Sequence, residues 1–162
     1  MKIETYKPDH LRAAVTIFRE LSKFYLAGMA SSEPEIEKNL VENILSGKSG
    51  VKLILALDEN GKAIGLATVS ILYPAPKEMG QLYLKELFVS SQCQGFGVGK
   101  KMMSFIANYA IKNGCSRLDW TTERDNVLAV EFYRSINAKA LEEKIYYRAE
   151  GQYLLDLAGA DY

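Results

Sequence analysis

The stretch SSQCQGFGVGKKMM, residues 90–103, is the feature that most constrains what this chain can fold into. It follows the apolar run QLYLKELFV (81–89), which is typical of a strand buried inside a sheet, and it leads into a helical pattern. Glycine destabilises the interior of strands and helices, so Gly95, Gly97 and Gly99 indicate a tight turn. The sequence therefore predicts a strand, a glycine-rich turn and a helix in direct succession.

Such a turn is suited to binding a phosphate, because the first N–H groups of a helix lack helical partners and the helix dipole favours an anion there. Lys100 and Lys101 oppose that dipole, and their placement is easier to explain if an anion binds nearby. A Walker-type loop is excluded by Gln94 and Lys101, and a dinucleotide fingerprint fails at Lys100. A plain turn with two solvated lysines is the alternative.

Length and composition limit the class of protein. The 162 residues fit one domain, 1–162, and 48% hydrophobic residues are enough for a packed core. Twenty basic residues balance twenty acidic ones, which gives no electrostatic footprint for nucleic acid. Cys93 and Cys115 lack metal-ligand spacing, so we expect two reduced thiols and no metal. No leader or membrane-spanning run is evident, so we expect a soluble, cytoplasmic protein with no membrane partner.

The remaining pattern predicts a mixed-sheet α/β (α+β) domain. The expected strands are 3–6, 51–57, 62–73, 81–89 and 117–122, and the expected helices are 8–25, 31–47, 98–113 and 125–136. A capping box runs from Ser32 to Glu35, and Asn60 with Gly61 indicates a hairpin turn. The tail 144–158 is expected to hold a strand and a short helix. Asn137 stands where a left-handed residue usually ends a helix.

Two segments carry a resemblance to a known family. QGFGVG resembles the Q/R-x-x-G-x-G/A motif of the GNAT superfamily of N-acetyltransferases, with Gln94, Gly97 and Gly99 at the motif positions. DNVLAVEFYRSINA (125–138) is similar to the family's N-x-x-A-x-x-F-Y segment, and departs from it at Asn137, where glycine is usual. Within the family, the chain is similar to diamine and thialysine acetyltransferases.

The resemblance implies a GNAT-like fold, with a mixed, mostly antiparallel sheet splayed between the strands 81–89 and 117–122 and helices on both faces. It also implies that acetyl-CoA binds in the gap. Gly95 is expected to be the least constrained of the three turn glycines. The cofactor-binding residues it implies are Leu87, Phe88, Val89, Gln94, Gly95, Phe96, Gly97, Val98, Gly99, Lys100, Asn126 and Tyr133.

The implied reaction is direct attack of an amine on the thioester. Tyr133 matches the family's proton donor to the leaving thiolate, although helical spacing alone favours a core aromatic. Glu86 is the candidate base, because alternation places it with Leu84 and Phe88 in an apolar strand, where its pKa could rise. A buried partner to a lysine or backbone donor is an equal alternative for Glu86.

Other residues near this segment leave alternatives open. Glu123 is the reserve base, and Trp120 and Tyr25 either line the acceptor pocket or are core aromatics. Lys85 stands where the diamine enzymes often have an acidic residue, which weighs against a polyamine acceptor.

Three functions stay open at this point. The first is acetyl transfer from acetyl-CoA to a primary amine of a polyamine-like or amino-acid-like small molecule. The second is acetylation of a protein N-terminus or lysine, and the third is CoA binding without catalysis. The acceptor would be set by residues 18–45 and the loop 74–80, where no motif constrains the chemistry. The resemblance is also compatible with a homodimer.

Overall fold

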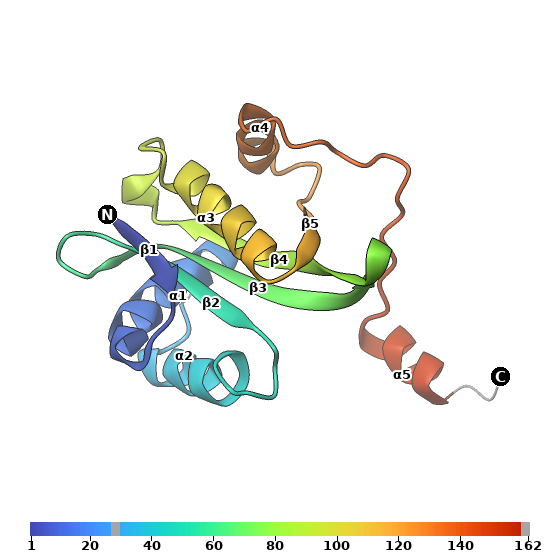
Figure 1. Ribbon diagram of the computed structural model, residues 1–162. Coiled ribbons are helices and arrows are strands. Elements are labelled where there is room, and N and C mark those ends of the chain that lie inside the picture. The colour runs from blue at the N-terminus through green and yellow to red at the C-terminus, as the bar shows by residue number, and fades with distance from the viewer. Residues whose placement is uncertain (27–29, 160–162) are drawn as a thin grey trace. The chain divides into compact units, whose positions relative to one another are not determined.

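The computed structural model describes residues 1–26 and 30–159 (Figure 1). These residues fall into two compact units, Met1–Thr121 and Thr122–Tyr162. The single domain expected over 1–162 stays a prediction. Of the segment 18–45 that we expect to influence the acceptor, residues 27–29 lie outside the described residues.

The first unit is built on a five-stranded sheet in the order β1-β2-β3-β4-β5. The strands are β1 (Lys2–Thr5), β2 (Lys52–Leu57), β3 (Ala63–Ala75), β4 (Met79–Val89) and β5 (Cys115–Trp120). Neighbouring strands pair antiparallel except β4 and β5, which are parallel. The mixed, mostly antiparallel sheet predicted from the sequence is therefore confirmed.

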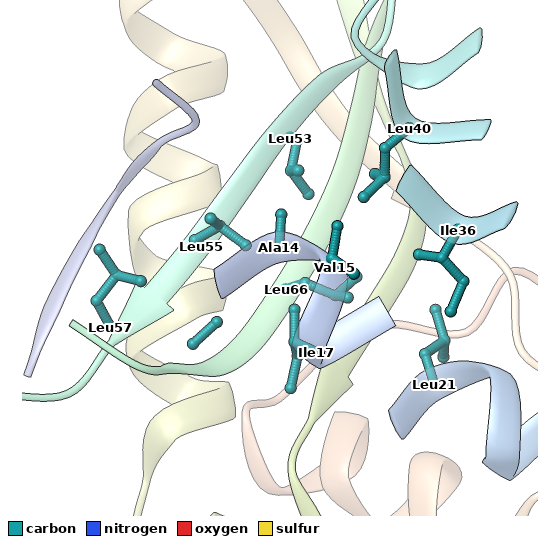
Figure 2. Packing of buried hydrophobic residues seen from close by; sticks show 11 residues of the cluster. Ala14, Val15, Ile17, Leu21, Ile36, Leu40, Leu53, Leu55, Leu57 and Leu66 are labelled. Carbon is teal, nitrogen blue, oxygen red and sulfur yellow. The ribbon is translucent and has the colours of Figure 1, made fainter. Parts of the chain in front are cut away.

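Two helices, α1 (Leu11–Tyr25) and α2 (Glu33–Asn39), cover one face of this sheet. A short π-helical segment, Leu40–Ile44, continues α2. Figure 2 shows apolar side chains of the two helices converging on β2 and β3. We call this group the α1 cluster; its members are Ala14, Val15, Ile17, Leu21, Ile36, Leu40, Leu53, Leu55, Leu57, Ala63 and Leu66.

The helix α3 (Val98–Lys112) packs on the opposite face. Leu53, Leu55 and Leu57 of β2 belong to the α1 cluster, and the alternating residues Ile54 and Ala56 are fully buried on the other side of the strand.

A glycine permits close approach between α3 and the sheet. A Cβ added at Gly65 of β3 would lie 2.7 Å from Met102 Sδ of α3, so a larger residue at this position would force the methionine side chain to shift. Helices on both faces of the sheet were expected and are confirmed.

The capping box and the hairpin turn predicted from the sequence are both present. Ser32 Oγ accepts a hydrogen bond from Glu35 N, and Ser32 N donates to Glu35 Oε2 at 2.9 Å, which completes the capping box. The Ser32 hydroxyl also donates to Glu35 Oε2 at 2.7 Å, and this bond, followed by that of the Ser32 backbone N–H, lowers the pKa of Glu35. In the β2–β3 hairpin, Gly61 N donates to Asp58 O at 3.2 Å and Gly61 takes the left-handed φ of 76° that the turn requires.

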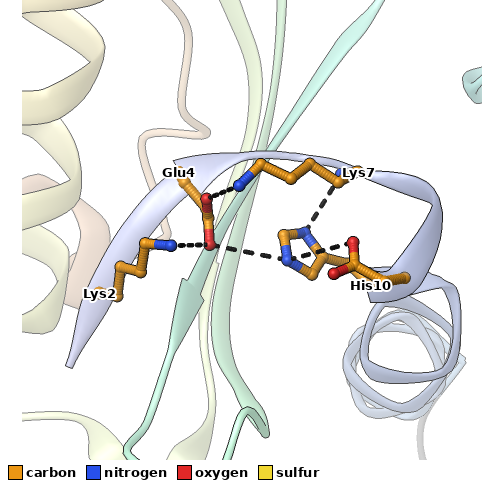
Figure 3. A network of polar contacts seen from close by, with 5 residues as sticks. Lys2, Glu4, Lys7 and His10 are labelled. Carbon is orange, nitrogen blue, oxygen red and sulfur yellow. Dashed lines mark hydrogen bonds and ion pairs between the residues drawn. The ribbon is translucent and has the colours of Figure 1, made fainter.

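A polar network fixes the N-terminal strand to the first helical turn (Figure 3). Lys2 Nζ lies 2.7 Å from Glu4 Oε1, and Lys7 Nζ lies 2.5 Å from Glu4 Oε2. Hydrogen bonds from these two lysines lower the pKa of Glu4 to about 2. His10 Nδ1 accepts the Lys7 backbone N–H at 3.2 Å, so the histidine is engaged in local structure.

The second unit contains two helices, α4 (Val127–Ser135) and α5 (Gly151–Gly159). Asn126 caps α4, because its side chain accepts a hydrogen bond from Ala129 N at 3.2 Å. Asn137 ends the helix with a left-handed φ of 59°, as expected, and Ala138 N donates to Tyr133 O.

The strand expected in 144–158 is wrong, because the described part of the second unit contains helix and irregular chain only. A strand needs a neighbouring strand for its N–H and C=O groups, and these described residues supply none within the unit.

Candidate functional site

The sheet of the first unit opens along one edge of β4. β5 pairs with β4 only from Gly80 to Leu84, where Leu84 lies opposite Trp120. β4 continues to Val89 and remains paired with β3 on its other side. No strand of the described residues pairs with the outer edge of β4 over residues 85–89. This unpaired edge, which we call the open edge, contains the positions Leu87, Phe88 and Val89 that the resemblance assigns to the cofactor.

A β-bulge marks the beginning of the open edge. Thr68 of β3 lies opposite Glu86, but the next residue, Val69, lies opposite Leu84. Lys85 is therefore the extra residue of β4, and it is exposed. A bulge shifts the alternation of side chains along a strand by one residue. Even-numbered residues of β4 therefore lie on one face of the sheet before the bulge and on the other face after it.

Because of the bulge, the residues around Glu86 differ from those predicted from the sequence. Phe88 packs against the α1 cluster, and Glu86, two residues earlier, shares that face. Leu84 lies opposite Val69, which lines a small cavity with Tyr109 of α3. The expectation that Leu84 and Phe88 flank Glu86 together is wrong for Leu84, because the bulge sends it to the α3 face.

The candidate base contacts the end of α1. Tyr25 Oη donates a hydrogen bond of 2.7 Å to Glu86 Oε2, and the carboxylate is half-buried. The rings of Phe24 and Phe88 lie 6.2 Å apart, and Phe24 is 66% exposed. The fold thus joins Glu86, the candidate base, to Tyr25, which the sequence left as either a pocket residue or a core aromatic. The two lie beside an accessible aromatic ring, an environment that can accept an amine bearing apolar carbons.

The glycine-rich turn lies between β4 and α3. Gly95 has φ 81° and Gly97, the residue before the first helical residue, has φ 78°. The expectation that Gly95 is the less constrained position is wrong, because both glycines adopt a left-handed conformation that other residues rarely take. Gly99 lies in the first turn of α3.

The backbone of this turn fits the anion that the sequence predicts. A Cβ added at Gly95 or Gly97 would meet no heavy atom of the described residues within 4 Å, so their free side faces open space. The first helical bond of α3 runs from Lys101 N to Gly97 O, and the preceding N–H groups at the helix start are the kind that bind phosphate.

Side chains around the turn differ in their roles. Gln94 Nε2 donates to Val89 O at 3.1 Å, so the motif glutamine holds the turn against the last residue of β4. Val98 is buried and anchors the helix start, and Phe96 is 80% exposed. Lys100 is exposed at the same end of α3.

One residue at this site was missed in the sequence. Glu20 of α1 accepts hydrogen bonds from the Ser90 hydroxyl and from both the backbone N–H and the hydroxyl of Ser91, the two residues that join β4 to the turn. The partners lie about 70 positions apart, and the helical pattern around Glu20 gives no sign of them.

The remaining candidates belong to the end of β5 and to the second unit. Trp120 is the last residue of β5. Glu123 is exposed, and Asn126 forms the cap of α4. Tyr133 is half-buried in α4, with its ring 5.2 Å from that of Phe132. The roles of Asn126 and Tyr133 toward the cofactor stay predictions, as does the reserve role of Glu123.

The part of the chain that the structure describes shows neither a metal site nor a membrane-spanning helix. Residues 1–26 and 30–159 contain no group of three or more His, Cys, Asp or Glu side chains arranged to hold a metal ion. Cys93 and Cys115 are free thiols, and burial raises the pKa of Cys115. Across the same residues, none of the helices has both the length and the apolar content needed to cross a bilayer.

Comparison with known families identifies the class of protein. The model of the acetyltransferase (GNAT) family matches residues 15–137. The uncharacterized N-acetyltransferase YhfO of Bacillus subtilis is 30% identical over 136 residues, which cover 82% of this chain and 86% of that protein. The chain therefore belongs to the acetyltransferase (GNAT) family, which confirms the resemblance seen in the two motifs.

Two further relatives bear on the subgroup and the fold. The mouse thialysine N-epsilon-acetyltransferase is 34% identical over 86 residues, so the match spans about half of each protein, 48% in both cases. An integron cassette protein from the mobile metagenome of V. cholerae has a solved structure that is 43% identical. It superimposes with a TM-score of 0.92 over 98% of both chains.

Proposed function

We propose that this protein is an acetyl-CoA-dependent N-acetyltransferase that acetylates a primary amine of a small molecule. The observation that carries the proposal is the open edge of β4, which leads directly into a glycine turn shaped for an anion, in a chain of the GNAT family. The similarity to an enzyme named for thialysine supports a small amine as acceptor. A cytoplasmic location and a homodimer stay predictions.

In this proposal the chain holds acetyl-CoA by its backbone. The N–H groups of residues 95–99 bind the pyrophosphate, and Lys100 adds positive charge at the same helix end. The N–H and C=O groups of the open edge over residues 87–89 pair with the pantetheine arm in the manner of an added strand. Bound acetyl-CoA supplies an acetyl group activated as a thioester.

Two side chains handle the protons. An alkylammonium has a pKa of about 10, so the acceptor must lose a proton before it becomes a nucleophile. Glu86 takes that proton in our proposal, and the Tyr25 hydroxyl fixes the direction of its carboxylate. Tyr133 then gives a proton to the departing thiolate, as its match to the family motif implies.

A panel assay tests the proposal. Thiol release from acetyl-CoA is measured with thialysine, lysine, ornithine, short diamines and lysine-containing peptides, and products are identified by mass. We expect acetylation of at least one small amine, with Tyr133→Phe lowering kcat about 10²-fold. Tyr153→Phe, a tyrosine of α5, is the matched control and should retain the wild-type rate.

Other results would point to the alternative functions. If peptides outcompete every free amine, the protein is a peptide N-acetyltransferase, and if acetyl-CoA binds without turnover, it is a CoA-binding module. A wild-type rate in Tyr133→Phe would remove the proposed proton donor.

A further inference from the structure

We infer that Glu20 is a positioning residue that holds the glycine-rich turn between β4 and α3 in its CoA-binding conformation, an inference that rests on the proposed function. Glu20 lies on α1, and the turn it contacts begins about 70 residues later. Glu20 Oε1 accepts three hydrogen bonds, from Ser90 Oγ at 2.9 Å, from Ser91 N at 3.0 Å and from Ser91 Oγ at 3.4 Å. All three donors belong to the two residues that follow β4.

The contact of Glu20 with Ser90 and Ser91 lies at the point where the chain leaves the open edge of β4. Among the described residues, β4 has a neighbouring strand on one side only over the open edge, so a second set of sheet hydrogen bonds does not hold the chain where it leaves the strand. Ser90 is 3% exposed, and its backbone N–H donates to Ile64 O of β3 at 3.0 Å. Glu20 adds an attachment to α1 on a different side, so the start of the turn is tied to both a strand and a helix.

The negative charge of Glu20 is unexpected beside a turn that is proposed to bind an anion. A carboxylate close to an anion-binding turn opposes the anion by simple electrostatics. Its presence is explained if the hydrogen bonds that it accepts are needed for the shape of the turn, since bonds to a charged acceptor are stronger than neutral ones. The same bonds occupy the Ser91 N–H, which fixes which backbone donors remain for the ligand.

A turn that is correctly shaped in only a fraction of molecules binds its ligand more weakly by that fraction. Loss of Glu20 should therefore weaken CoA binding without changing the groups that carry out the proton transfers.

The test compares Glu20→Ala and Glu20→Gln with wild type by calorimetric titration with free CoA and by amide hydrogen exchange of the unliganded protein. We expect Glu20→Ala to raise the Kd for CoA about tenfold or more and to speed exchange over residues 91–99. Glu20→Gln keeps an acceptor oxygen and should show a smaller change of the same sign. Glu33→Ala is the matched control, because it removes a carboxylate that pairs with Arg19 of α1 and leaves in place the hydrogen bonds of Glu20 to Ser90 and Ser91.

Steady-state kinetics add a second readout. A raised KM for acetyl-CoA with kcat retained distinguishes positioning of the turn from general damage, which urea unfolding of each variant also monitors. If Glu20→Ala does not fold, Ser91→Ala removes one donor and should weaken CoA binding less strongly.

Different results would overturn the inference about Glu20 and the proposed function. Tighter or equal CoA binding by the Glu20 variants would overturn the inference, since electrostatics alone predicts tighter binding. A wild-type protein that does not bind CoA at all would instead overturn the proposed function, and the inference with it.

Discussion

Replacing Gly97 by alanine offers a sharp test of the proposed CoA-binding role of the glycine-rich turn, because the structure separates the cost to stability from the effect on binding. Gly97 has φ 78°, and an added Cβ would meet no heavy atom of the described residues within 4 Å. The side chain therefore has room, and the penalty comes from the left-handed backbone alone. For a residue with a Cβ that penalty is about 1–2 kcal/mol.

The chain contains a matched control at Gly61. Gly61 has φ 76° and equally open surroundings, but it lies in the β2–β3 hairpin turn. Alanine at either position should therefore lower the free energy of unfolding by the same amount, about 1–2 kcal/mol, measured by urea denaturation. Only the Gly97 variant should lose affinity for CoA, at least about tenfold, which corresponds to about 1.4 kcal/mol.

Asparagine at the same two positions refines the test. Asparagine tolerates the left-handed conformation, so Gly97→Asn should cost less stability than Gly97→Ala. It should still weaken CoA binding, because its side chain occupies the open space beside the helix N-terminus. The reasoning would be refuted if the Gly97 variants lost the expected stability and bound CoA as tightly as wild type in calorimetric titration.

Two further predictions concern the candidate base and the N-terminal network. Glu86→Gln should lower kcat/KM for the acceptor by about 10²–10⁴-fold while CoA binding stays unchanged, and a wild-type rate would exclude Glu86 as the base. The pKa of Glu4 is lowered from 4.5 to about 2, so its contribution to stability is complete above pH 4.5 and is lost as the pH falls toward 2. Urea unfolding should thus show Glu4→Gln less stable than wild type at pH 7, with the difference shrinking toward pH 2 and at high salt; a difference independent of pH would contradict the role of the carboxylate.

The sequence predicted the parts of the molecule that depend on neighbouring residues. The capping box of Ser32 and Glu35 and the left-handed Asn137 involve contacts or backbone preferences within a few positions. The glycine turn is of the same kind, because only glycine readily takes the φ of Gly97. The order of the elements then followed from hydrophobic periodicity.

Predictions that depended on distant partners were less successful. The tail 144–158 was expected to hold a strand and a short helix, and it contains the helix α5 but no strand. The local sequence does not supply the neighbouring strand that a strand needs. The face occupied by Leu84 depended on a bulge at Lys85, which is a property of the pairing between β3 and β4.

By itself, the sequence determined the position of the glycine-rich turn, because glycine is the residue that readily takes the left-handed backbone of Gly95 and Gly97. The family was identified from the resemblance of two short motifs, QGFGVG and DNVLAVEFYRSINA. Only the tertiary structure decided where β5 leaves β4 and which residues of α1 reach that opening. Tyr25 meets Glu86 across 61 positions and Glu20 meets Ser90 across 70. Such contacts arise when α1 packs on the sheet, and helical periodicity can say which face of a helix is buried but not which polar groups it will meet there.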